Sequence, residues 1–345
     1  MKLRDLATWG GITLGAVGAA LAIKSFLPQR FMSSAPWYEK NVQAPTIDTS
    51  TMPQIDVRFL RCGSVTIPEC IAVRGAFSLA PRTIAYSAVL IHHPRATFLY
   101  DTGLSHDIHT YIADTPLLFR KTLGSFLQEQ SLASHLHYTG IASNNPQFAL
   151  LSHLHWDHVS GIPDLPGVPL RINRVEYDAA KLGLLDSNQG LVRRLMGPNP
   201  IELFDCTGPS YEGFRSSHDL FGDGSIMLVP LPGHTPGQMG MFINRSNGPR
   251  LFLLGDAAWI NENYLRPATM HPFIWSAVTA DDATARQTLI DLHQFARQHP
   301  EIPMIGMHDA DMQEQFMTVG AGLAPARKGN VGAGFTPSPT HLGQT

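Results

Sequence analysis

A short segment rich in histidine constrains this chain more than any other feature. Residues 152–158 read Ser-His-Leu-His-Trp-Asp-His and directly follow an apolar, strand-like segment. Neutral imidazole nitrogen and carboxylate oxygen are the atoms that bind zinc and its neighbours in the transition series. On an extended chain His153 and His155 point to the same side, whereas Asp157 and His158 follow as the chain turns. One loop can therefore supply ligands to two adjacent metal positions.

Three later segments each place a histidine or an aspartate after an apolar run. His234 stands in a Pro-Gly-His-Thr-Pro-Gly segment, Asp256 follows a glycine, and His308 comes soon after another glycine. Sheet-based enzymes carry their chemistry on loops held by rigid strands. Alone, such a residue is more often a cap or a turn residue. Together with the histidine-rich segment, the three complete a ligand set for two metal ions.

With these residues the chain resembles the metallo-β-lactamase-fold superfamily of metal-dependent hydrolases. The family's His-x-His-x-Asp-His motif corresponds to residues 153–158, and the Asp-Thr-Gly at residues 101–103 is similar to a family feature that precedes this motif. The resemblance spans about residues 55–311 and is closest in look to the lactonase and glyoxalase II-type branch. It implies an α/β (α+β) fold arranged as a four-layer αββα sandwich.

The resemblance also implies a role for each candidate ligand. The first metal ion would be held by His153, His155 and His234, the second by Asp157, His158 and His308, and Asp256 would bridge the two. Two divalent ions, zinc in preference to iron or manganese, would activate a water or hydroxide for attack on a lactone, ester or thioester carbonyl. The catalytic carboxylates would be Asp157 and Asp256, and Asp157 would also carry a proton to the leaving oxygen.

The sequence indicates an apolar substrate pocket beside this centre. Some lactonases carry a tyrosine three residues after the bridging aspartate, where this chain has Trp259, which offers an indole N–H but no hydroxyl. Apolar residues cluster at 117–127 and at 259–275. We expect Trp259, Tyr264 and Phe126 to contact substrate, although ordinary core packing or a dimer contact explains both clusters equally well.

Composition agrees with a folded enzyme that acts on a small molecule. The chain has 345 residues, 43% of them hydrophobic, and its formal charge of −3 comes without a dense Lys/Arg run. Such a balance predicts a large core and no nucleic-acid partner. Alternatives on the same fold are a mono-iron, persulfide dioxygenase-like protein and a β-lactam or phosphodiester hydrolase. The oligomeric state stays open, a homodimer included.

The N-terminal residues 1–27 form a separate hydrophobic segment. Residues 6–23 carry only Thr8 and Thr13 as polar side chains, and a helix of this length spans roughly 27 Å, barely the bilayer core. A cleaved signal peptide, an uncleaved anchor and an amphipathic extension are the three interpretations, of which we favour the uncleaved anchor. The protein would then be membrane-anchored or exported, at a bacterial inner membrane or in the periplasm. Lysine and arginine on both flanks leave the side of the membrane open.

The remaining chain divides into a linker at 28–53, a catalytic domain at 54–319 and a disordered tail at 320–345. Alternating or apolar runs predict strands near residues 55–60, 88–92, 97–100, 148–151, 226–229, 239–243, 251–254 and 304–307. Helices are expected near 117–130, 175–182 and 282–298. Three cysteines cannot form a disulfide framework, but a Cys62–Cys70 bridge stays open for an exported domain.

Overall fold

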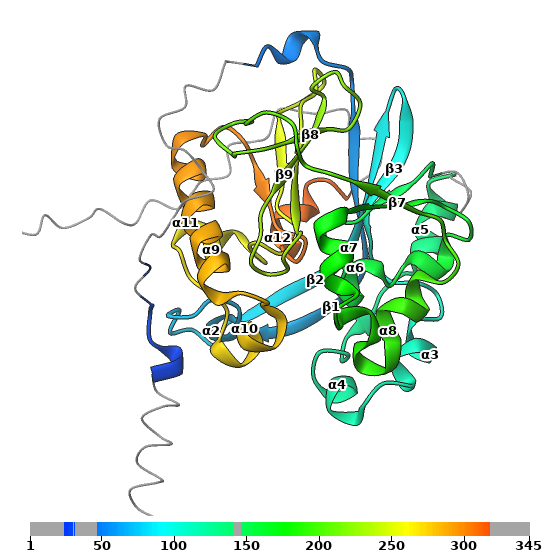
Figure 1. Cartoon of the computed structure of the whole chain (residues 1–345). Helices are drawn as coiled ribbons and strands as arrows, with labels where there is room; N and C mark the ends of the chain where they lie inside the picture. The colour runs from blue at the N-terminus through cyan, green and yellow to red at the C-terminus, as the bar shows by residue number, and fades with distance from the viewer. Residues whose placement is uncertain (1–23, 30, 32–46, 141–145, 318–345) are drawn as a thin grey trace, which may run out of the picture.

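A computed structural model describes residues 24–29, 31, 47–140 and 146–317 (Figure 1). The apolar residues 6–23 and the tail at 320–345 lie outside these ranges. Within them, no helix combines the length and the apolar character that crossing a membrane requires.

Two mixed β-sheets, built from the described residues, form the centre of the fold (Figure 1). The larger sheet has the strand order β4 (Leu127–Gln128), β1 (Asp56–Pro68), β2 (Pro81–His93), β3 (Ala96–Thr102), β5 (Ala149–Leu150), β6 (Leu170–Asn173) and β7 (Ile201–Phe204). The smaller sheet has the order β12 (Met304–Ile305), β11 (Leu251–Leu253), β10 (Met239–Ile243), β9 (Ile226–Pro230) and β8 (His218–Asp219). Strands β3, β5, β6 and β7 run parallel, as do β11 and β12. Every expected strand overlaps one of these, whereas the short strands β4, β6, β7 and β8 were not anticipated.

Buried side chains divide this fold into layers. On β3, Phe98 and Tyr100 belong to an apolar cluster between the two sheets, while Leu99 belongs to the cluster on the outer face of the larger sheet. Successive residues of a strand face opposite sides, so one strand serves both clusters. A third cluster, which includes the stacked rings of Phe242 and Phe252, covers the outer face of the smaller sheet. The layering agrees with the αββα arrangement expected from the sequence.

Helices cover both outer faces. The α-helices are α2 (Glu69–Ala72), α3 (Ile108–Ala113), α4 (Leu117–Lys121), α5 (Leu132–Tyr138), α6 (Trp156–Val159), α7 (Arg174–Ala180), α8 (Ser187–Met196), α9 (Asn261–Leu265), α10 (Pro272–Val278), α11 (Asp282–Gln298) and α12 (Ala310–Glu314). Short 3-10 helices are η1 (Thr49–Thr51), η2 (Ile162–Asp164) and η3 (Leu184–Asp186). The bounds of α11 are those predicted. It begins where the Asp281 carboxylate accepts hydrogen bonds from the backbone N–H groups of Ala283 and Thr284.

The helix expected at residues 117–130 is wrong in its second half. Helix α4 ends at Lys121, and the backbone N–H of Gly124 returns to the carbonyl oxygen of Phe119. Residues Leu127–Gln128 then form β4, which pairs with β1. The apolar residues of this stretch suit a helix face, but the turn at Gly124 and the free edge of β1 decide the outcome.

Two smaller expectations are also resolved by the structure. Cys62 and Cys70 are both buried and free, so they do not form a bridge. Parts of the segment expected as a linker lie against the body: Phe31 packs on the core of the smaller sheet, and Pro28 lies against Gly75.

Candidate metal centre

The candidate ligands lie on loops that leave the carboxyl ends of strands. The histidine-rich loop follows β5, and His234, Asp256 and His308 follow β9, β11 and β12. These strands belong to both sheets, so the loops meet above the seam between the sheets. Backbone at His155 is extended and α6 begins at the next residue. The divergence expected between the two halves of the loop arises at this junction.

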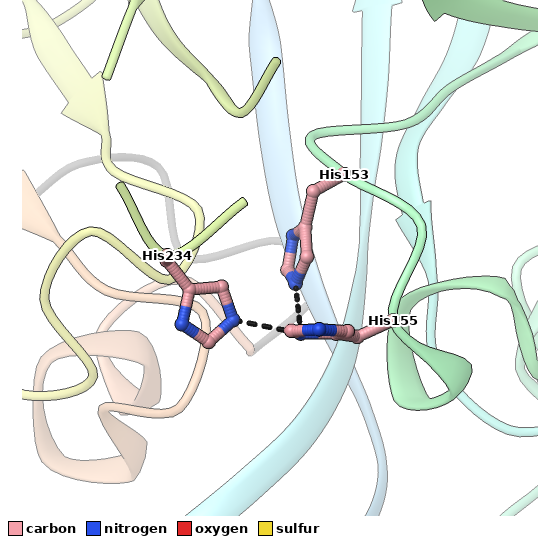
Figure 2. A group of neighbouring side chains, drawn as sticks. All are labelled: His153, His155 and His234. Carbon is pink, nitrogen blue, oxygen red and sulfur yellow. Dashed lines mark hydrogen bonds between the residues drawn. The ribbon is translucent and has the colours of Figure 1, made fainter. Parts of the chain in front are cut away.

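Three imidazoles converge on the first candidate position (Figure 2). Nε2 of His153 lies 3.1 Å from Nδ1 of His155, which in turn lies 2.8 Å from Nε2 of His234. His153 and His234 are buried, and His155 is half-buried. The structure thus brings together three residues that are up to 81 positions apart in the sequence, 153 to 234.

A second group lies beside the first. His308 and His158 place Nε2 at 3.4 Å and 3.9 Å from Oδ2 of Asp157. Asp256 lies between the groups: its Oδ2 is 3.0 Å from Nε2 of His308 and 3.4 Å from Nε2 of His234. A carboxylate within reach of both groups is placed to bridge two cations.

Hydrogen bonds to the outer ring nitrogens fix which imidazole nitrogen is free. Ser152 Oγ donates to Asp101 Oδ2 at 2.8 Å, so it can only accept from Nδ1 of His153, which is 3.0 Å away. Asp101 also accepts from Nδ1 of His158 at 2.8 Å, and the carbonyl oxygen of Ala85 accepts from Nδ1 of His308 at 2.7 Å. In the neutral imidazole a proton on Nδ1 leaves a lone pair on Nε2. In their neutral forms, all three rings therefore direct a bare Nε2 toward the centre.

The two groups of ligands differ in the direction in which the pKa values of their imidazoles are shifted. Burial, followed by repulsion from neighbouring imidazoles, holds the pKa of His153 and of His234 well below the usual value. Burial alone disfavours the charged form of His158, but the carboxylates of Asp256 and Asp101 raise its pKa well above the usual value. Burial alone would likewise raise the pKa of Asp256, yet His308 and His158 hold it well below its usual range. Asp256 is therefore ionised and can bind a cation.

These donors fit two divalent metal ions of the zinc type. Nε2 of His158 and Oδ1 of Asp256 are buried, lie 3.2 Å apart and have no hydrogen-bond partner among the described residues. In the first group, Nδ1 of His155 lies within hydrogen-bond distance of Nε2 of His153 and of Nε2 of His234. A single proton on Nδ1 can serve only one of these two contacts, so the other is left without a hydrogen bond. A bound cation satisfies both arrangements, and imidazole with carboxylate is the ligand chemistry of zinc.

Glu176, on α7, ties the two halves of the first group together, and sequence reasoning missed it. Its Oε1 accepts the backbone N–H of Leu154 at 2.9 Å, and its Oε2 accepts the backbone N–H of Gly237 at 3.0 Å. Leu154 lies between the two histidines of the motif, and Gly237 lies three residues after His234. A Cβ on Gly237 would come within 2.1 Å of the Glu176 nitrogen, so only glycine permits this approach. The sequence signal was a lone glutamate on a helix, a weak one.

A cavity of about 500 Å³ opens over the centre. Its floor includes the candidate ligands His155, Asp157, His234, Asp256 and His308. Most of its wall is apolar and comes from β1, β2, α4, α8 and α10, with Phe119, Leu191 and Ile274 among the lining side chains. Such a cavity suits a ligand with an apolar body and one polar reacting group.

Of the three residues expected to contact substrate, only Trp259 lines the cavity. The ring centroid of Trp259 lies 4.9 Å from that of His308, and its Nε1 is buried without a partner among the described residues. Tyr264 lies in the core of the smaller sheet, where its hydroxyl donates to the carbonyl oxygen of Met304. Phe126 packs against Trp156 and is not among the side chains that line the cavity.

Tyr86, on β2, was not anticipated. It lines the cavity, and its ring centroid lies 5.6 Å from that of His308. Burial, followed by the charges of Asp157 and Asp256, raises the pKa of the Tyr86 phenol. The hydroxyl therefore stays protonated at neutral pH and can donate a hydrogen bond. In the sequence Tyr86 reads as an ordinary strand residue, which is why no motif pointed to it.

Comparison with known proteins agrees with this geometry. The chain matches the family model described as the metallo-beta-lactamase superfamily over residues 82–287, more than half of its length. The chain belongs to the metallo-beta-lactamase superfamily. A probable metallo-hydrolase of Mycobacterium tuberculosis is 26% identical over 275 residues, which cover 76% of this chain and 83% of the relative. An N-acyl homoserine lactonase of Rhizobium radiobacter is 25% identical over 193 residues, which cover 55% of this chain and 68% of the relative.

Solved structures share the superfamily fold. An N-acyl homoserine lactone hydrolase, with the product N-hexanoyl-L-homoserine bound at its catalytic metal centre, superposes with a TM-score of 0.58 at 18% identity. The match covers 76% of this chain and 97% of that one. Together with the His/Asp clusters, these similarities identify a metal-dependent hydrolase of the metallo-beta-lactamase superfamily, lactonase-like through distant relatives.

Proposed function

We propose that this protein hydrolyses a lactone, ester or thioester that carries an apolar acyl group. The observation that carries the proposal is the cavity, which joins a cluster of metal-type ligands to a mostly apolar wall. The lactonase relatives supply independent support for a carbonyl substrate. Two zinc ions would be held by the seven candidate ligands: His153, His155, Asp157, His158, His234, Asp256 and His308. Such ions lower the pKa of a water molecule and polarise a carbonyl oxygen.

The chain's own groups supply the rest of the reaction. Asp157 is the least buried carboxylate of the centre, with 13% of its side chain exposed, and is placed to move a proton between the centre and the leaving oxygen. Tyr86 and Trp259 line the same cavity, and each carries a hydrogen-bond donor, an O–H and an N–H respectively. The apolar side chains exclude water from the acyl group and hold its carbonyl carbon beside the ligand cluster. No serine or cysteine nucleophile is required.

A substrate panel tests the proposal. We expect turnover of acyl-homoserine lactones, simple lactones, aryl esters or glutathione thioesters by the zinc-loaded protein, with two zinc ions per chain. If two or three of the six additional methylene groups are buried, at about 0.8 kcal/mol each, KM for an N-decanoyl substrate should be roughly 10- to 100-fold below that of its N-butanoyl counterpart. Activity confined to a penicillin or a phosphodiester would contradict a carbonyl-ester substrate. A single iron with oxygen uptake on a persulfide would identify the dioxygenase alternative.

The Tyr86 hydroxyl should contribute to turnover. We expect Tyr86→Phe, which keeps the ring, to lower kcat on the order of 10²-fold while KM and metal content change little, because one donor to a developing negative charge is lost. Tyr264→Phe is the matched control: its hydroxyl binds Met304 in the core, so kcat should stay within about twofold. Equal kcat values for the wild type and Tyr86→Phe would remove Tyr86 from the reaction.

A further inference from the structure

Two helices that line the cavity, α4 and α10, also expose large apolar side chains to solvent. On α4, Phe119 lines the cavity, whereas Leu117 and Leu118 are 61% and 76% exposed. On α10, Ile274 lines the cavity and Phe273, at its edge, is 63% exposed. Figure 1 shows α2, α4 and α10 at the same end of the molecule. We call this set of exposed side chains, with Phe77 and Leu79 of the connection between α2 and β2, the apolar rim.

The described start of the chain packs beside two elements that line the cavity, α2 and α10. The Arg74 guanidinium, just after α2, donates to the backbone carbonyl oxygens of Lys24 and Leu27. Ser25 hydrogen-bonds to the ring of His271, the N-cap of α10, at 2.9 Å, and the ring centroid of Phe26 lies 4.6 Å from that of His271. Ser25 and Phe26 therefore contact a residue that lies two positions before the exposed Phe273.

The sequence on either side of these contacts suits a lipid surface. Residues 6–23, directly before Lys24, are apolar apart from two threonines. On α4, the apolar Leu117 and Leu118 are followed by the exposed basic residues Arg120 and Lys121. Apolar side chains next to lysine and arginine are typical of segments that lie in the interface of an anionic membrane. The apolar run at residues 6–23 would span roughly 27 Å as a helix, which is length enough to enter the bilayer beside the rim.

We propose that the apolar rim docks on a lipid bilayer, so that the mouth of the cavity opens toward the membrane. The apolar run before Lys24 holds the chain at the membrane surface. The contacts of residues 24–27 with Arg74 and His271 set which face of the protein meets the lipid. A substrate with a long acyl chain then passes from the bilayer into the cavity without crossing water. This last step rests on the function proposed above, whereas the docking itself does not.

Fluorescence of the full-length protein on vesicles tests the docking. An environment-sensitive nitrobenzoxadiazole probe is placed on Leu118→Cys or Phe77→Cys, each combined with Cys206→Ser because Cys62 and Cys70 are buried. On phosphatidylcholine vesicles with a quarter of phosphatidylglycerol, both probes should shift to the blue and be quenched by brominated acyl chains. The matched control is Tyr138→Cys on α5, an equally exposed position at 80% that is outside the rim, and its probe should remain unquenched.

Three results would overturn the docking. The protein could fail to sediment with vesicles, or the rim probes could behave like the probe at position 138. The rim probes could also be shielded in the absence of lipid by a dimer that size measurement detects, which would make a second copy the occupant of the rim.

Activity separates the docking from the proposed chemistry. Leu118→Ser should lower turnover of a membrane-partitioned, long-acyl substrate about tenfold and leave turnover of a short, soluble one unchanged, and Tyr138→Ser should change neither. If no ester, lactone or thioester is hydrolysed while the rim probes are quenched, the proposed function fails and the docking stands. If substrates are hydrolysed while the rim probes are not quenched, the reverse holds.

Discussion

His153→Ala is expected to lower turnover at least about 10³-fold and to reduce the zinc content of the purified protein. His153 is fully buried and its Nε2 is close to both His155 and Asp256. Its removal takes one ligand from the first position and leaves a gap beside the bridging carboxylate. Metal ions contribute several kcal/mol to reactions of this kind, and each 1.36 kcal/mol corresponds to a factor of ten in rate. Elemental analysis and kcat/KM for the best substrate of the panel are the measurements.

The matched control for this variant is His137→Ala. His137 is exposed on α5 and belongs to none of the metal-type clusters among the described residues. Its variant should keep wild-type zinc content and turnover. Wild-type zinc content and turnover in His153→Ala as well would refute the ligand assignment.

Glu176→Gln should weaken zinc binding roughly 10- to 100-fold, although Glu176 itself is not a ligand. An amide can accept only one of the two backbone N–H groups, from Leu154 and Gly237, that the carboxylate accepts now. The other N–H would face an NH₂ group, so one metal loop loses its support. Groups that orient metal ligands typically cost this much in affinity when they are replaced. The unpaired N–H should also lower the free energy of unfolding by about 1–3 kcal/mol.

Competition with a chelator measures the zinc affinity and thermal unfolding of the metal-free protein measures the stability. Glu202→Gln is the control, because Glu202 forms an exposed ion pair with Arg171 on the same sheet. It should change stability by less than about 0.5 kcal/mol and leave zinc affinity unaltered. If Glu176→Gln were less stable but bound zinc as tightly as the wild type, Glu176 would have a packing role only.

Sequence reasoning located the candidate ligands because their signals are local. Four of them lie within one loop, and each of the others follows an apolar run through a turn. The groups that orient them were harder to recognise. Glu176 acts on backbone atoms 22 residues before it and 61 residues after it, so no spacing reveals the contact. Tyr86 reaches the centre only because β2 passes beneath it, and the order of strands in a sheet is a tertiary property.

The helix predicted at residues 117–130 was wrong in its second half for a related reason. Its apolar spacing suits a helix, and only the partner strand shows that Leu127–Gln128 extends the sheet instead. The same limit applies to the pocket. Trp259 and Tyr264 stand five positions apart in the sequence, yet one lines the cavity and the other lies in the core. Local pattern predicts that such side chains are buried, but not on which side of the backbone.

The metal-type ligands and the cavity wall come from different elements of the fold, and this affects how the sequence and the substrate of such a protein can change in evolution. The candidate ligands follow strands of the two sheets, whereas much of the cavity wall comes from α4, α8 and α10, which lie outside the sheets. Insertions or substitutions in these helices can alter the choice of substrate without displacing a ligand or opening the core. Descendants of one ancestor can therefore retain the same hydrolytic centre while they move to new acyl groups. A shared fold at 18% identity is the kind of outcome that this separation favours.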